Sequence, residues 1–90
     1  IARVEQQWAD EGQTIVNAVQ QLGEAQGVQV EPITVTSDRV GETIINTAER
    51  HECDLIVMAS HGRRGFNKLL LGSETQHVLT HTHLPVLVLR

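Results

Sequence analysis

The chain has 90 residues, 40% of them hydrophobic, a length that suits one folded domain and excludes a second. Seven Lys and Arg residues against eleven Asp and Glu residues give a formal charge of -4. This negative charge argues against nonspecific electrostatic binding to nucleic acid or to an anionic membrane. The single cysteine, Cys53, excludes an internal disulfide and a thiolate metal cluster, and it favours a reducing, cytoplasmic compartment.

Within the 90 residues there is no run of about 18 apolar residues, and no short apolar segment follows a basic start. We therefore expect no membrane partner. The chain opens on Ile1 inside a helical pattern. We expect residues 1–90 to form a single domain whose first strands are missing.

The first predicted element is an amphipathic helix that ends near Gly27. Apolar residues recur at spacings of three, four and seven, which is typical of one buried helix face: Val4, Trp8, Ile15, Val19 and Leu22. An exposed Trp8 could stack on a base, but an aromatic residue at this spacing is more typical of a core. The pattern therefore predicts that Trp8 is buried.

An edge strand and a second helix are predicted next. Residues 28–35 are rich in Val and Ile but contain Pro32, which lacks an N–H and is tolerated mainly at sheet edges. Residues 40–48 then change to helical spacing. The polar residues at 36–38 precede them and can cap the free N–H groups of this helix.

The sequence pattern in the last third of the chain predicts a strand, a helix and a second strand. Residues 54–59 are apolar without alternation after Asp54, as in a parallel strand covered on both faces. Residues 73–76 match a capping box that starts a helix through about His81, and residues 85–89 form a final strand. The alternation predicts an α/β fold with an open parallel sheet and flanking helices. Ligands of such sheets bind beyond the carboxyl ends of the strands.

The loop at that position, residues 59–73, suits a phosphate. It holds three of the seven basic residues: Arg63, Arg64 and Lys68. Gly62 and Gly72 let backbone N–H groups approach an anion, and a helix beginning at Ser73 offers free amides. Turn glycines, solvated cations and a simple helix cap would explain the same residues. Neither the P-loop ending Gly-Lys-Ser/Thr nor Gly-x-Gly-x-x-Gly is present.

These residues resemble the universal stress protein family. The resemblance covers the whole chain and is tightest in DLIVMASHGRRG at 54–65, LLLGS at 69–73 and LPVLV at 84–88. The family's nucleotide motif is a glycine, two residues, a second glycine, nine residues, and a third glycine followed by Ser or Thr. Gly62, Gly72 and Ser73 match the second and third parts, and Ala59 stands where the first glycine is expected.

The resemblance implies an adenine nucleotide alpha hydrolase-like, or Rossmann-like, fold and a stress-response regulator that binds ATP or a related adenine nucleotide. Magnesium would travel on the phosphates. The implied nucleotide-binding residues are Met58, Ala59, Ser60, His61, Gly62, Arg63, Gly72, Ser73, Glu74 and Thr75. Residues 58–61 would border the ribose, backbone amides would meet the phosphates, and Arg63 would neutralise charge. If Ala59 needs a positive φ, it would cost on the order of 1 kcal/mol.

The resemblance also implies a homodimer, because the family places its last strand at a sheet edge. Pairing with a second copy across a two-fold axis would cover that edge. The predicted interface is Val86, Leu87, Val88 and Leu89. The alternative function is a dimeric interaction module of the same fold that binds no nucleotide.

The histidines and the cysteine are further candidates for a metal site or a catalytic site. His77 and His81 are one helical turn apart and could share a zinc ion with His83, but no fourth ligand is evident, so no metal is expected. His61 could act as a catalytic base, but no acidic residue that would orient its ring is evident in the sequence. We therefore expect no dedicated enzymatic activity, while slow ATP hydrolysis or autophosphorylation stays open. Cys53 is expected to be a small packing residue.

Overall fold

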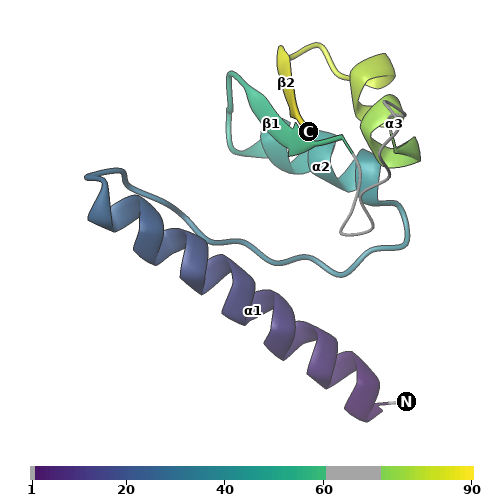
Figure 1. The fold of residues 1–90 in the computed structure, drawn as a ribbon. Coiled ribbons are helices and arrows are strands. Elements are labelled where there is room, and N and C mark those ends of the chain that lie inside the picture. The colour runs from purple at the N-terminus through teal and green to yellow at the C-terminus, as the bar shows by residue number, and fades with distance from the viewer. Residues whose placement is uncertain (1, 61–71) are drawn as a thin grey trace. The chain divides into compact units, whose positions relative to one another are not determined.

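The computed structural model describes residues 2–60 and 72–90. Within them the elements, in chain order, are α1 (Ala2–Ala25), α2 (Val40–Arg50), β1 (Ile56–Ala59), α3 (Ser73–His81) and β2 (Val86–Leu89) (Figure 1). The chain forms two compact units, Ile1–Thr36 and Ser37–Arg90.

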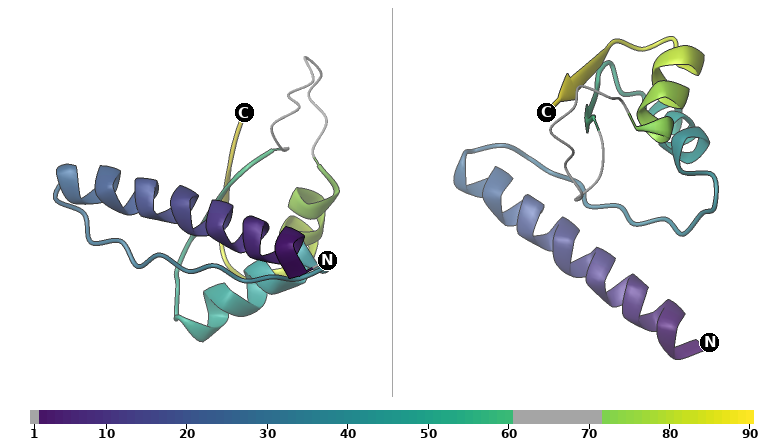
Figure 2. Two further views of the ribbon diagram at one scale, coloured as in Figure 1. Left: turned by 90° about the horizontal axis from the view of Figure 1, so that it is seen from below. Right: turned by 45° about the vertical axis from the view of Figure 1, so that its right-hand side comes forward.

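The first unit consists of α1 and an extended segment that returns alongside it (Figure 2). The amide of Gln20 donates to the carbonyl of Val30 at 3.4 Å. Gly23 leaves room for this return, because a Cβ on Gly23 would overlap Cγ2 of Val30. The helix predicted to end near Gly27 is confirmed.

Two expectations about this unit are wrong. Residues 28–35 are extended but form no strand, because no neighbouring strand pairs with them among the described residues and Pro32 has no N–H to donate. Trp8 is 64% exposed rather than buried. One helix and one extended segment offer too little apolar surface to cover the stripe that the sequence placed in a core.

The second unit is built on two parallel strands. β1 and β2 pair from Ile56 with Val86 to Ala59 with Leu89. α2 and α3 pack on one face of this pair, where side chains from both helices and β1 form the core: Ile45, Ala48, Ile56 and Val78. No described helix of this unit covers the opposite face, where Val57, Leu87 and Leu89 are about half exposed. The sequence predicted helices on both faces of the strand at 54–59, but the described helices of this unit cover one face.

Two helices end in the same hydrogen-bonded motif with different residues at the critical position. After α1, the N–H groups of Val28 and Gly27 bond to the carbonyls of Gly23 and Glu24. After α2, Cys53 and Glu52 bond in the same way to Ala48 and Glu49. The left-handed residue of this Schellman motif is Gly27 at φ 75° in one case and Glu52 at φ 55° in the other. Glu52 therefore carries a backbone cost that Gly27 avoids.

We predict that Glu52→Gly stabilises the protein by about 0.5 to 1 kcal/mol, because relief of the left-handed strain exceeds the entropy that glycine adds to the unfolded chain. Gly27→Ala is the matched control and should destabilise by about 1 kcal/mol. Urea denaturation midpoints measure both changes. A less stable Glu52→Gly variant would contradict the prediction.

Candidate functional site

The carboxyl end of β1 is joined to the start of α3 by a backbone hydrogen bond. The N–H of Gly72 donates to the carbonyl of Ser60 at 2.6 Å, and the N–H of Ser60 donates to the carbonyl of Leu89 at 2.7 Å. The two residues that flank positions 61–71 are thus bonded to each other. The end of β1 and the start of α3 therefore lie next to each other.

The side chain of Thr75 strengthens this junction. Its hydroxyl lies 3.0 Å from the carbonyl oxygen of Ala59 and 3.2 Å from that of Ser60, in positions to donate to either. Both Thr75 and Ser60 are buried, with Thr75 only 3% exposed. The hydroxyl of Thr75 therefore points toward the end of β1 and is hydrogen-bonded there.

The start of α3 differs from the capping box predicted from Ser73 and Gln76. The N-cap is Gly72, whose carbonyl accepts the N–H of Gln76 at 3.0 Å, and no side-chain cap hydrogen bond is formed at this end. Ser73 is the first helical residue and is exposed. The bond from Gly72 to the strand end draws the helix start back by one residue, which explains the failed prediction.

This geometry leaves backbone donors at the start of α3. The first N–H groups of an α-helix have no acceptor within the helix, here those of Ser73, Glu74 and Thr75. The positive end of the helix dipole lies at the same place. Backbone amides and the Ser73 hydroxyl therefore offer donors beside the carboxyl end of β1.

The carboxylate of Glu74 is hydrogen-bonded to another helix, α2. Its Oε1 accepts the N–H of Gly41 at 3.0 Å, in the first turn of α2. Gly41 is buried, and a Cβ there would lie 2.9 Å from Cδ2 of His77 and 3.1 Å from Oε1 of Glu74. Glycine thus permits the close approach of the two helices. Sequence reasoning missed this contact, although a glycine inside a helical pattern signals close packing.

We predict that Glu74→Ala destabilises the protein by about 1 to 2 kcal/mol, because the N–H of Gly41 loses its acceptor. Glu74→Gln keeps a carbonyl acceptor and should retain most of the stability. Glu42→Ala is the control on α2, since its pair with Arg39 at 3.5 Å is exposed and contributes less than about 1 kcal/mol. Equal denaturation midpoints for Glu74→Ala and the wild type would refute the capping role.

The sequence-predicted site residues fall into three groups. His61, Gly62 and Arg63 lie outside the described residues. Met58 packs against the core, so it contributes its backbone rather than its side chain to the edge of the sheet. The remainder lie together at the junction of β1 and α3: Ala59, Ser60, Gly72, Ser73, Glu74 and Thr75.

Ala59 occupies its position without backbone strain. Among the described residues other than glycine, only Glu52 has a positive φ. Ala59 is an ordinary residue of β1 paired with Leu89. The conformational cost considered for an alanine at this motif position therefore does not arise, and its methyl group is the remaining difference from glycine.

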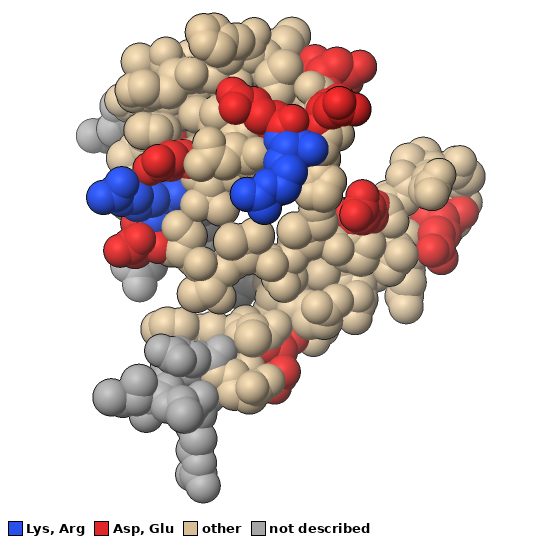
Figure 3. Space-filling view, turned by 180° about the vertical axis from the view of Figure 1, so that it is seen from behind, with Lys and Arg blue, Asp and Glu red and all other residues tan. Residues whose placement is uncertain are grey.

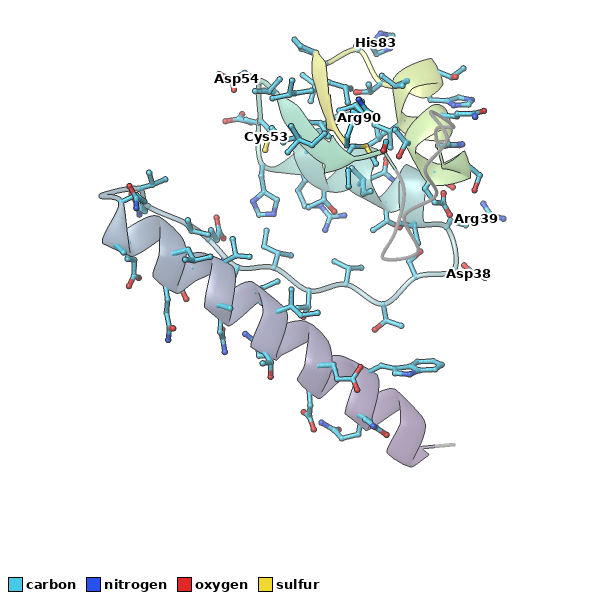
Figure 4. The ribbon with its side chains drawn as sticks, viewed as in Figure 1. Asp38, Arg39, Cys53, Asp54, His83 and Arg90 are labelled. Carbon is cyan, nitrogen blue, oxygen red and sulfur yellow. The ribbon has the colours of Figure 1, made fainter. Side chains whose placement is uncertain are left out.

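Acidic side chains outnumber basic ones on the face shown in Figure 3, in keeping with the formal charge of -4. Arg90 follows β2 at the carboxyl end of the sheet, whereas Asp38 and Arg39 lie by the start of α2 (Figure 4). Arg90 was not among the predicted site residues, although its place directly after the final strand could have indicated it.

The histidines and the cysteine give no metal site in the described ranges. The rings of His77 and His81 stack with centroids 4.1 Å apart, and Nδ1 of His81 lies 2.9 Å from the carbonyl oxygen of His77. No group of three or more potential ligands comes together in the part of the chain that is described. Cys53 is exposed, so the expectation that it packs in the interior is wrong.

The chain belongs to the Universal stress protein family, whose sequence pattern it matches over residues 2–90. It is 35% identical over 81 residues to universal stress protein MJ0531 of Methanocaldococcus jannaschii, a match that covers 90% of this chain and 47% of that protein. It is 36% identical over 64 residues to a universal stress protein of Thermus aquaticus, covering 71% of this chain and 47% of the other.

The fold is similar to that of a solved relative. The structure of MJ0577, also from Methanocaldococcus jannaschii, matches with a TM-score of 0.86 at 30% identity, over 98% of this chain and 60% of the other. The predicted family and α/β fold are confirmed. The chain spans about half the length of the MJ0531 and Thermus aquaticus relatives. No helix in the described residues is long and apolar enough to cross a membrane.

Proposed function

We propose that the chain is a stress-response regulator that binds ATP or a related adenine nucleotide where β1 ends and α3 begins. The observation that carries the proposal is the bond from Gly72 N–H to Ser60 oxygen. It brings the start of α3, which has no side-chain cap, to the carboxyl edge of the parallel pair. Gly72 and Ser73 at this start match the last part of the nucleotide motif of the family that the sequence resembles.

Four residues of the junction, Ala59, Ser60, Ser73 and Glu74, contact the nucleotide in this proposal. The backbone amides of Ser73 and Glu74 donate to phosphate oxygens, and the Ser73 hydroxyl adds a donor. Ala59 and Ser60 border the ribose, and Gly62 and Arg63 complete the phosphate contacts. A magnesium ion binds mainly through the phosphates. The proposal includes no dedicated enzymatic step.

We predict that Gly72→Val raises the dissociation constant for ATP by at least about tenfold, because a branched side chain would occupy the space where amides meet phosphate. The φ of -63° and ψ of 155° at Gly72 are open to any residue, so backbone strain is no competing cause. Calorimetric titration with ATP and magnesium measures affinity, and thermal melting checks the fold.

Two outcomes would separate the candidate functions. A folded Gly72→Val variant that binds ATP like the wild type would remove this junction from the site. An intact wild type that binds no adenine nucleotide would favour the alternative, a dimeric interaction module.

We further propose that two copies pair through the free edge of β2. Ile56 and Ser60 donate to the carbonyls of Pro85 and Leu89. In a parallel ladder the polar groups of alternate residues face opposite edges, so those of Val86 and Val88 point away from β1. An apolar strand with such a free edge is an aggregation hazard unless it is covered.

We predict that Val88→Pro converts a homodimer to monomer or aggregate, since it removes a donor from the free edge in both copies. Leu87→Pro is the contrasting variant, because its N–H faces β1 and its loss should unfold the strand pair. Sedimentation equilibrium and circular dichroism measure assembly and fold. A wild type that stays monomeric at high micromolar concentration would refute the dimer.

A further inference from the structure

The hydroxyl of Thr75 is an unusual group to find beside a proposed ligand site, because it is buried and already bonded. It lies within 3.2 Å of two consecutive carbonyl oxygens, those of Ala59 and Ser60. The oxygen of Ser60 also accepts the N–H of Gly72 at 2.6 Å. Bonds from α3 and its N-cap therefore converge on the last carbonyl of β1, that of Ala59, and on the next one, that of Ser60.

These bonds fix the first turn of α3 in place. Gly72 holds the helix start through its backbone, and Thr75, three residues later, holds the opposite end of the same turn. Glu74 between them bonds sideways to Gly41 of α2. The turn that carries the first amides of α3 is thus attached to both a strand and a helix in the absence of any ligand.

We propose that Thr75 is a positioning residue for the anion site rather than a ligand of the nucleotide. Its hydroxyl sets the first turn of α3 against the end of β1, so that the amides of Ser73 and Glu74 are ordered in advance. Donors that are already ordered bind an anion more tightly, because less freedom is lost on binding. This inference rests on the proposed function for its ligand, but the junction itself can be measured without nucleotide.

The test compares three variants at a temperature where all are folded. Thr75→Val keeps the shape and removes the hydroxyl, and Thr75→Ser keeps the hydroxyl and removes a methyl. Ile45→Val, in the core on α2, is a control for general destabilisation. We expect the ATP dissociation constant to rise about tenfold in Thr75→Val and to stay within about twofold in the other two.

A second readout needs no ligand. The amide of Gly72 donates to Ser60, so its hydrogen exchange reports local opening of the junction. Without ATP, this exchange should be about tenfold faster in Thr75→Val, beyond any change in global stability, and unchanged in Ile45→Val after the same correction.

The outcomes distinguish the two proposals. If Thr75→Val and Ile45→Val weaken ATP binding equally, or if Thr75→Val leaves both affinity and Gly72 exchange unchanged, the positioning role is overturned. If the wild type binds no nucleotide while Gly72 exchange accelerates only in Thr75→Val, the proposed function fails and the positioning of α3 by Thr75 is supported.

Discussion

The hydrogen bond from Gly72 to Ser60 is the contact on which the candidate site depends. It links the end of a strand to the beginning of a helix across positions 61–71, and it sets where that helix starts. The same strand end is held from the other side by the bond from Ser60 to Leu89 of β2. A single residue, Ser60, therefore connects β1 to both β2 and α3 at this edge of the sheet. Any anion bound there would meet donors whose geometry depends on this residue.

Local sequence patterns were sufficient for most elements of the fold. The helical spacing from Val40 to Ala48 and the apolar runs before Ala59 and Leu89 predicted α2, β1 and β2 correctly. The parallel order followed from alternation of strands and helices and agrees with the pairing of β1 with β2. The expected position of the candidate site rests on the rule that ligands bind at the carboxyl edge of such a sheet.

The failed predictions share a physical cause, which is that partners distant in sequence decided the outcome. Ser73 has every local mark of an N-cap, yet a bond to Ser60 moved the cap to Gly72. The contact of Glu74 with Gly41 joins residues 33 positions apart, and no local pattern encodes it. Trp8 and residues 28–35 have patterns that require a further layer, and the unit that contains them does not supply one. Glu52 is a separate case. Its helix end is a local motif, and the sequence did not indicate it because glutamate is not a residue that marks a helix end.

The pairing of β1 with β2 also has a consequence for how the chain folds. Paired residues of the two strands, such as Ile56 and Val86, are about 30 positions apart, and α3 and residues 61–71 lie between them. Closing so long a segment costs chain entropy before the hydrogen bonds between the two strands can form. The helices α1 and α2, in contrast, form from contacts within a few residues. We therefore expect the helices to form early and the two strands to meet late. Until they meet, the backbone edges and apolar side chains of β2 stay open to other chains, which makes this last step the one most exposed to misassembly.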